Sequence, residues 1–194
     1  GRFDIAYQAA LSRWLQPSTA TTLSVSKSGE GTVVSLPTGL NCGSSCSWPY
    51  DPGATVTLAA SAKPGYQFAG WAGACSGSSP LCQVTLSASQ SVTASFTPVA
   101  SAGTGLLGTP VDGTTVSGVG VISGYHCSSK NLEVFIDGVS AGKAGAGTRL
   151  LGTQDVCGRT DTGYSILYNF NNLSNGLHVV HVTADGVQLD SHVV

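Results

Sequence analysis

The chain has 194 residues, of which only eight are Lys or Arg and ten are Asp or Glu, so its formal net charge is −2. Nucleic-acid-binding proteins carry clustered basic residues, whereas those of this chain are scattered singly, which argues against a nucleic-acid partner. No apolar run reaches the ~20 residues that a membrane-spanning helix requires. Hydrophobic residues make up 41% of the chain and recur in patterned runs, which excludes a disordered coil. We therefore expect a folded protein rich in strands and turns.

The first residues, 1–17, have a helical pattern. Apolar side chains recur there at helical spacing, and Pro17 follows where a helix should end. The polar face carries too few basic residues to bind a membrane surface. We interpret this short helix as the tail of a preceding domain.

After a Ser/Thr/Ala linker, the period of the apolar residues changes to two, which predicts half-buried antiparallel strands. The alternating residues are Leu23 and Val25, Val56 and Leu58, Tyr66 and Phe68, Val84 and Leu86, and Val92, Ala94 and Phe96. Turn sequences such as Asp51-Pro52-Gly53 separate these runs. The pattern predicts a compact β-module over residues 22–98.

Residues 99–109 are rich in small side chains and have no clean period, so we expect them to link two domains. Beyond this linker, residues 110–194 contain further runs of strand residues. These runs are Val116–Ile122, Leu132–Ile136, Tyr164–Phe170, His178–Ala184 and Val187 onward. Short strands separated by Asp-Gly turns are typical of an immunoglobulin-like (Ig-like) β-sandwich. The expected fold class is all-β, with two small β-domains and a short N-terminal helix.

Six cysteines fall into three local pairs. The pairs are Cys42 with Cys46, Cys75 with Cys82, and Cys127 with Cys157. A zinc site is the alternative, but the CxxC spacing of zinc sites and a following His at the right distance are missing. We expect structural disulfides, which persist in oxidising compartments and place the protein outside the cell or in the periplasm.

Residues 23–97 contain an ordered set of motifs. In chain order they are Gly29-x-Gly31, Cys42-x3-Cys46, Pro64-Gly65-Tyr66-x-Phe68-x-Gly70-Trp71, Cys75 with Cys82, and Val92-Thr-Ala-Ser-Phe96. This set resembles the divergent InlB B-repeat family of bacterial surface and secreted proteins. Residues 109–194 contain TPVDGTTVSGVGVISGYHC, VFIDG, DVCGRTDTGY and NNLSNGLHVVHVTADG, and with these segments they resemble a bacterial Ig-like module. Both resemblances imply location and architecture, and they name no ligand and no catalytic motif.

Aromatic residues on a rigid β-scaffold can stack on sugar rings. Tyr66, Phe68 and Trp71 belong to the alternating pattern, so we assign them to the core. This leaves Trp48 and Tyr50 as the expected exposed candidates for ligand contact.

A second candidate site surrounds Cys157. Its polar residues are Arg149, Asp155, Arg159 and Asp161, with His126 beside Cys127. A hydrolase would need a poised pair of carboxylates or a nucleophile with its base, and calcium could use Asp155 and Asp161, although an EF-hand spacing is absent. We expect instead that both carboxylates order the loop by capping turns and pairing with the arginines.

The last predicted strand carries two further expectations. His178 and His181 are spaced so that they lie on opposite faces of a strand, where we expect surface or sandwich-edge positions. The strand ending at residues 191–194 is shorter than an Ig-like closing strand. An edge left open there could pair with a partner strand, although a boundary of the fragment is the simpler explanation.

The functional prediction is an extracellular, non-catalytic binding or structural segment of a bacterial surface or secreted protein, acting in adhesion, as a stalk or in surface assembly. The alternative is the accessory carbohydrate-binding region of a secreted hydrolase. We expect no cofactor and no metal. The expected partner is a protein or a glycan at the cell surface, with self-assembly as a further route.

Overall fold

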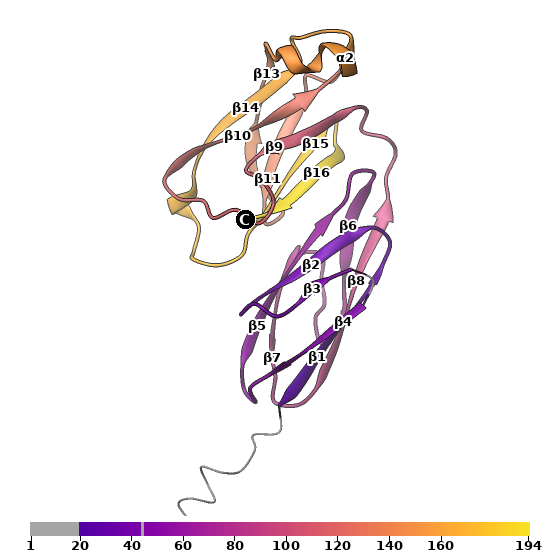
Figure 1. The fold of residues 1–194 in the computed structure, drawn as a ribbon, viewed down its shortest axis with the longest axis vertical. Helices are drawn as coiled ribbons and strands as arrows, with labels where there is room; N and C mark the ends of the chain where they lie inside the picture. The colour runs from indigo at the N-terminus through magenta and orange to yellow at the C-terminus, as the bar shows by residue number, and fades with distance from the viewer. Residues whose placement is uncertain (1–19, 44) are drawn as a thin grey trace, which may run out of the picture.

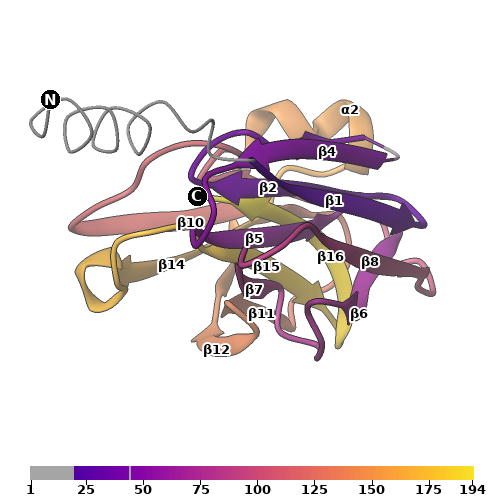
Figure 2. The ribbon, with the colours of Figure 1, turned by 90° about the horizontal axis from the view of Figure 1, so that it is seen from below.

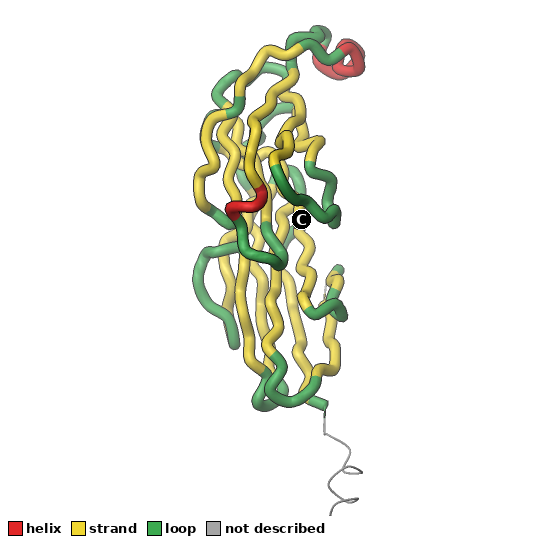
Figure 3. Tube along the Cα trace, turned by 90° about the vertical axis from the view of Figure 1, so that its left-hand side faces the viewer, coloured by secondary structure: helices red, strands yellow, loops and turns green. Residues whose placement is uncertain are grey.

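The computed structural model describes residues 20–43 and 45–194, and this part of the chain is all-β, as the sequence predicts. Its strands form four four-stranded sheets, which pack in pairs around two separate hydrophobic cores. The resulting two β-sandwich modules are stacked end to end along the long axis of the molecule (Figures 1 and 3). The helix expected over 1–17 lies outside the described residues.

The first module is formed by the strands up to residue 98. They are β1 (Thr21–Ser28), β2 (Gly31–Leu36), β3 (Asn41–Cys42), β4 (Ser45–Tyr50), β5 (Thr55–Ala62), β6 (Tyr66–Gly73), β7 (Leu81–Thr85) and β8 (Gln90–Pro98). One sheet has the order β4-β1-β8-β6 and the other β3-β2-β5-β7. The pairing of β1 with β8 is parallel, unlike the antiparallel arrangement that the sequence predicts. Figure 2 views this module along the long axis.

Two of these strands, β2 and β4, escape a search for alternating apolar residues. The inward positions of β2 include Gly31 and Ser35, which are buried without being apolar. A Cβ at Gly31 would lie 2.4 Å from the ring of Phe96, so glycine provides the space for that ring. Strand β4 contains Pro49, which normally argues against a strand but is tolerated at a sheet edge.

The second module is formed by β9 (Gly105–Thr109), β10 (Val119–His126), β11 (Leu132–Ile136), β12 (Val139–Lys143), β13 (Gly145–Thr148), β14 (Gly163–Asn169), β15 (Val179–Ala184) and β16 (Val187–Val193). Its short helical turns are η1 (Leu151–Thr153), α2 (Gln154–Cys157) and η2 (Phe170–Asn172). The sheets have the orders β13-β14-β10-β9 and β12-β11-β15-β16.

The linker predicted over 99–109 contains strand β9. Leu107 of β9 is buried in the second core, and β9 pairs with β10, so the second module begins before Pro110. Sequence reasoning missed this strand because it lies among small residues and has a single large inward-facing side chain. The predicted strand at Val116–Ile122 also begins later, because Gly118 takes a φ of +66° that interrupts an extended chain.

The boundary between the modules is packed rather than open. Every residue from 58 to 62 in β5 is buried, although alternate residues of a strand face opposite sides. One face of β5 fills the core of the first module, and on the other face Ala59 packs with Val179 and Val193 of the second module. The two modules therefore share a small apolar cluster.

The strand edge expected to be open at residues 191–194 is covered. The carboxylate of Asp190 accepts a hydrogen bond from the Leu107 amide, and the Val193 amide donates to the carboxylate of Asp112. The Val193 carbonyl in turn accepts from the amide of Gly113. The segment between β9 and β10 thus occupies the edge that a partner strand would need.

Candidate functional site

The cysteines form three local disulfides. Cys42–Cys46, Cys75–Cys82 and Cys127–Cys157 have Cα–Cα distances of 5.5, 6.2 and 5.1 Å. The first bridges β3 and β4, which belong to different sheets, and so closes one seam of the sandwich. The third joins the end of β10 to α2. None of the six sulfurs is a free thiol available to a metal or a substrate.

Tyr50 is not an exposed ligand contact, and that expectation is wrong. Only 8% of its surface is accessible, and its hydroxyl lies 2.9 Å from the hydroxyl of Ser35. Ser35 in turn donates to the carbonyl of Pro37 and accepts from the amide of Leu40. Because successive side chains of β4 face opposite sides of the sheet, Tyr50 points inward. Its hydroxyl links the 37–40 loop to the sandwich through Ser35.

Trp48 is half-exposed, with 46% of its surface accessible. It lies opposite Leu23, a core residue, so its indole faces the seam between the two sheets. A Cβ at Gly39 would lie 2.5 Å from the Trp48 Cδ1, which shows that the indole lies directly on the backbone of this glycine. Trp48 thus covers the core edge with part of its indole and leaves the rest accessible to solvent.

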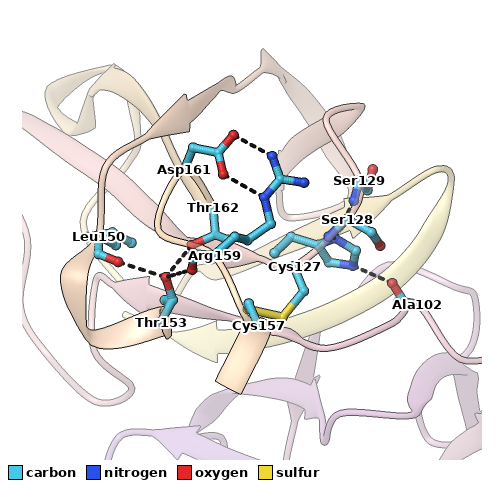
Figure 4. The surroundings of a disulfide bond; sticks show 11 residues. Ala102, Cys127, Ser128, Ser129, Leu150, Thr153, Cys157, Arg159, Asp161 and Thr162 are labelled. Carbon is cyan, nitrogen blue, oxygen red and sulfur yellow. Dashed lines mark hydrogen bonds and ion pairs between the residues drawn. A yellow bond between two sulfur atoms is a disulfide. The ribbon is translucent and has the colours of Figure 1, made fainter. Parts of the chain in front are cut away.

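The loop around Cys157 is ordered by hydrogen bonds at the end of the second module far from the first (Figures 1 and 4). The Thr153 hydroxyl is 2.8 Å from the Leu150 carbonyl, 3.1 Å from the Arg159 carbonyl and 2.6 Å from the Thr162 hydroxyl. Asp161 forms an ion pair with Arg159 through both carboxylate oxygens. The hydrogen bond from Arg159 lowers the pKa of Asp161 to about 2.

Asp155 and His126 do not join this cluster. Asp155 is exposed in the first turn of α2, which has no side-chain cap, so its predicted capping role is wrong. The ring of His126 is buried, with Nε2 2.5 Å from the Ala102 carbonyl and Nδ1 accepting from the Ser129 amide at 2.7 Å. The Cys157 loop is a structural network whose ionised carboxylate is paired, and the separate His126 imidazole is bonded to backbone groups.

Across residues 20–43 and 45–194, no group of three or more His, Cys, Asp or Glu side chains is close enough to bind a metal ion. The helices within these same ranges are too short to cross a membrane.

His178 and His181 are more buried than the sequence predicts. Both ring nitrogens of His178 have hydrogen-bond partners: Nδ1 is 2.6 Å from the Asp137 carboxylate, and Nε2 is 2.8 Å from the Ser174 carbonyl. Burial opposes the charged form, but the hydrogen bonds to these acceptors raise the pKa of His178. His181 stacks on Phe135 with ring centroids 4.8 Å apart, and burial lowers its pKa to about 4.

A groove of about 1190 Å³ lies between the two modules. The first module contributes the outward face of β2 and the 37–41 loop, and the second contributes residues 112–117 and 170–178. Sequence reasoning missed this site, because its walls meet only when the modules pack together. No local motif marks it.

Comparison with known proteins finds a family match for the first module. Residues 21–100 match the divergent InlB B-repeat domain family. These limits begin at the first residue of β1 and end two residues after β8, so the match covers the whole first sandwich. No curated protein and no solved structure matches the chain.

The structure of the first module explains the motifs of the first half of the sequence. Gly29 takes a φ of +79°, and a Cβ there would lie 2.1 Å from the Phe96 carbonyl oxygen, so β1 can turn into β2 only with glycine at this position. The indole of Trp71 is buried and donates to the Ser79 carbonyl at 2.9 Å. These residues build the module and are not exposed to a ligand.

Proposed function

We propose that the chain is an extracellular, non-catalytic segment of a bacterial surface or secreted protein, in which a B-repeat module and an Ig-like module form one stiff binding unit. The observation that carries this proposal is the packed module boundary, where Ser61 donates to the Ser191 carbonyl at 2.7 Å. Inter-domain motion is the usual behaviour of linked modules unless their interface is well packed. A stalk or adhesion segment uses such a boundary to hold its surfaces in a fixed position.

The location follows from the cysteines and from the family of the first module. All six cysteines are paired, and such disulfides persist in oxidising compartments. The InlB B-repeat family is found in bacterial surface proteins. Both observations favour the outside of the cell.

A binding role is favoured over catalysis by the state of the polar side chains. Asp161 is paired with Arg159, and both nitrogens of His126 face backbone groups. A general base needs a free nitrogen or oxygen within reach of its substrate. The groove between the modules, in contrast, is a concave surface to which both modules contribute side chains.

The location is tested by labelling intact cells of the native bacterium with an antibody raised against residues 21–194. We expect labelling without permeabilisation, or recovery of the protein from the culture medium, with a cytoplasmic protein as the negative control. Labelling only after permeabilisation, with none in the medium, would overturn the extracellular assignment.

A further inference from the structure

The groove between the modules has an almost uncharged lining. Asp112 and His178 are the residues with ionisable side chains among those that line it. One carboxylate oxygen of Asp112 accepts from the Val193 amide at 2.7 Å, and the His178 ring is held by Asp137 and Ser174. An anionic ligand would find no free cationic partner in this lining, and Asp112 would repel it. The lining therefore disfavours an anionic ligand.

On the first-module wall of the groove, the strand backbone is already paired, and side chains provide the hydrogen-bonding groups. Its floor in the first module is a sheet face, to which β2 presents Thr32, Val34 and Leu36. On a sheet face the backbone groups are already used by the neighbouring strands, and β2 is paired on both sides, with β3 and with β5. A peptide therefore cannot add to β2 as an extra strand, which is the usual way in which sheets bind extended chains.

Hydroxyl and amide side chains supply the polar part of the lining. Thr32, Asn41, Ser117 and Asn175 each offer a donor and an acceptor. Sugar hydroxyls are also both donors and acceptors, so they complement such groups without charge. The remaining lining includes Val34, Leu177 and other aliphatic residues, against which the CH faces of sugar rings can pack.

We propose that this groove binds a neutral oligosaccharide, with both modules contributing contacts. The inference rests on the proposed function, because the groove exists only while the modules are packed together. The proposed carbohydrate-binding surface therefore lies at the module boundary. The sequence favours β4, where Tyr50 is buried and Trp48 is a single exposed aromatic side chain. The volume of about 1190 Å³ is larger than a single sugar ring needs and suits several linked rings.

The test is an NMR titration of the ¹⁵N-labelled protein with hexasaccharides of glucose, xylose, mannose and N-acetylglucosamine. We expect at least one neutral glycan to shift amide signals of both 37–41 and 173–177, and an oligogalacturonate of the same length to cause no shift. An Asn41→Ala/Asn175→Ala double variant removes one amide from each wall, since both residues are exposed. It should weaken binding about tenfold.

The matched control is Asn131→Ala, which removes an exposed amide outside the groove and should leave the affinity unchanged. Shifts confined to residues around Trp48, or no shift with any neutral glycan, would overturn the proposal. Binding of an uncharged Ser/Thr-rich peptide in place of the glycans would overturn it as well. Backbone ¹⁵N relaxation on the same sample distinguishes failure of this proposal from failure of the proposed function. If the modules tumble together but no glycan binds, only the glycan-binding proposal is wrong. If the modules tumble independently, the proposal of a stiff two-module unit is wrong.

Discussion

Ser61 of the first module and Ser191 of the second hydrogen-bond to each other across the module boundary. The Ser61 hydroxyl is 2.7 Å from the Ser191 carbonyl and 3.0 Å from the Ser191 hydroxyl, which itself donates to the Ala62 carbonyl at 2.9 Å. Both side chains are buried. Polar groups buried in this way are costly unless paired, so the boundary has one preferred register.

The first prediction concerns this pair. Ser61→Ala leaves the Ser191 carbonyl without its donor in a buried position, which should lower the free energy of unfolding by about 1–3 kcal/mol. Urea denaturation followed by circular dichroism measures the change. The control is Ser87→Ala, at an exposed turn, which should lie within about 0.5 kcal/mol of the wild type. Equal effects of the two substitutions would show that the boundary hydrogen bonds contribute nothing.

The second prediction concerns acid. Burial lowers the pKa of His181 to about 4 from an ordinary value of 6.5, so between these pH values the unfolded chain binds a proton that the folded chain does not. Stability should therefore fall as the pH falls from 6.5 to 4, by up to about 3 kcal/mol from this group. His181→Gln should flatten that part of the stability curve, measured by urea denaturation at each pH. An unchanged slope in the variant would assign the acid sensitivity to other groups.

The third prediction concerns His178 at pH values above 6.5. Its pKa is raised, so its contribution to stability is complete below the ordinary value of 6.5 and is lost as the pH rises through the raised value. Both ring nitrogens face acceptors, and the neutral ring can donate to only one of them. We expect His178→Gln to remove this loss of stability above pH 6.5. An NMR titration of the ring protons that gives a His178 pKa below 6.5 would contradict the assignment.

The fourth prediction compares two disulfides. Cys127–Cys157 spans 30 residues and Cys42–Cys46 spans four. In the chain-entropy account, the longer loop stabilises by about 3.5 kcal/mol and the shorter by about 2 kcal/mol. The Cys127→Ser/Cys157→Ser variant should therefore unfold at a lower urea concentration than Cys42→Ser/Cys46→Ser. The reverse order would mean that closing the seam between β3 and β4 outweighs loop length.

Sequence reasoning succeeded where one face of a strand is apolar. The alternation of Leu23 with Val25 and of Val92 with Phe96 identifies β1 and β8, and Leu132–Ile136 coincides with β11. It failed where inward positions carry small or polar residues, as at Gly31 and Ser35 of β2. In these strands the core is filled by a partner, such as the Phe96 ring, that lies far away in the sequence.

The candidate sites were harder to predict for the same reason. Trp48 and Tyr50 are separated by one residue, and their different exposure depends on the loop that carries Gly39. The groove depends on the docking of β5 against β15 and β16, and the alternating pattern of β5 contains no sign that Ala59 and Ser61 would be covered. A polar or small residue on the outward face of a strand has the same appearance whether it faces water or a second module.

The most direct test of the stiff two-module unit is backbone ¹⁵N relaxation of wild type and of Ala59→Asp, which places a carboxylate against Val179 and Val193. The structure predicts one common rotational diffusion tensor for both modules in the wild type. In Ala59→Asp it predicts faster, independent tumbling, and the exposed control Ala72→Asp should behave as the wild type. Separate tumbling of the two modules in the wild type would contradict the account.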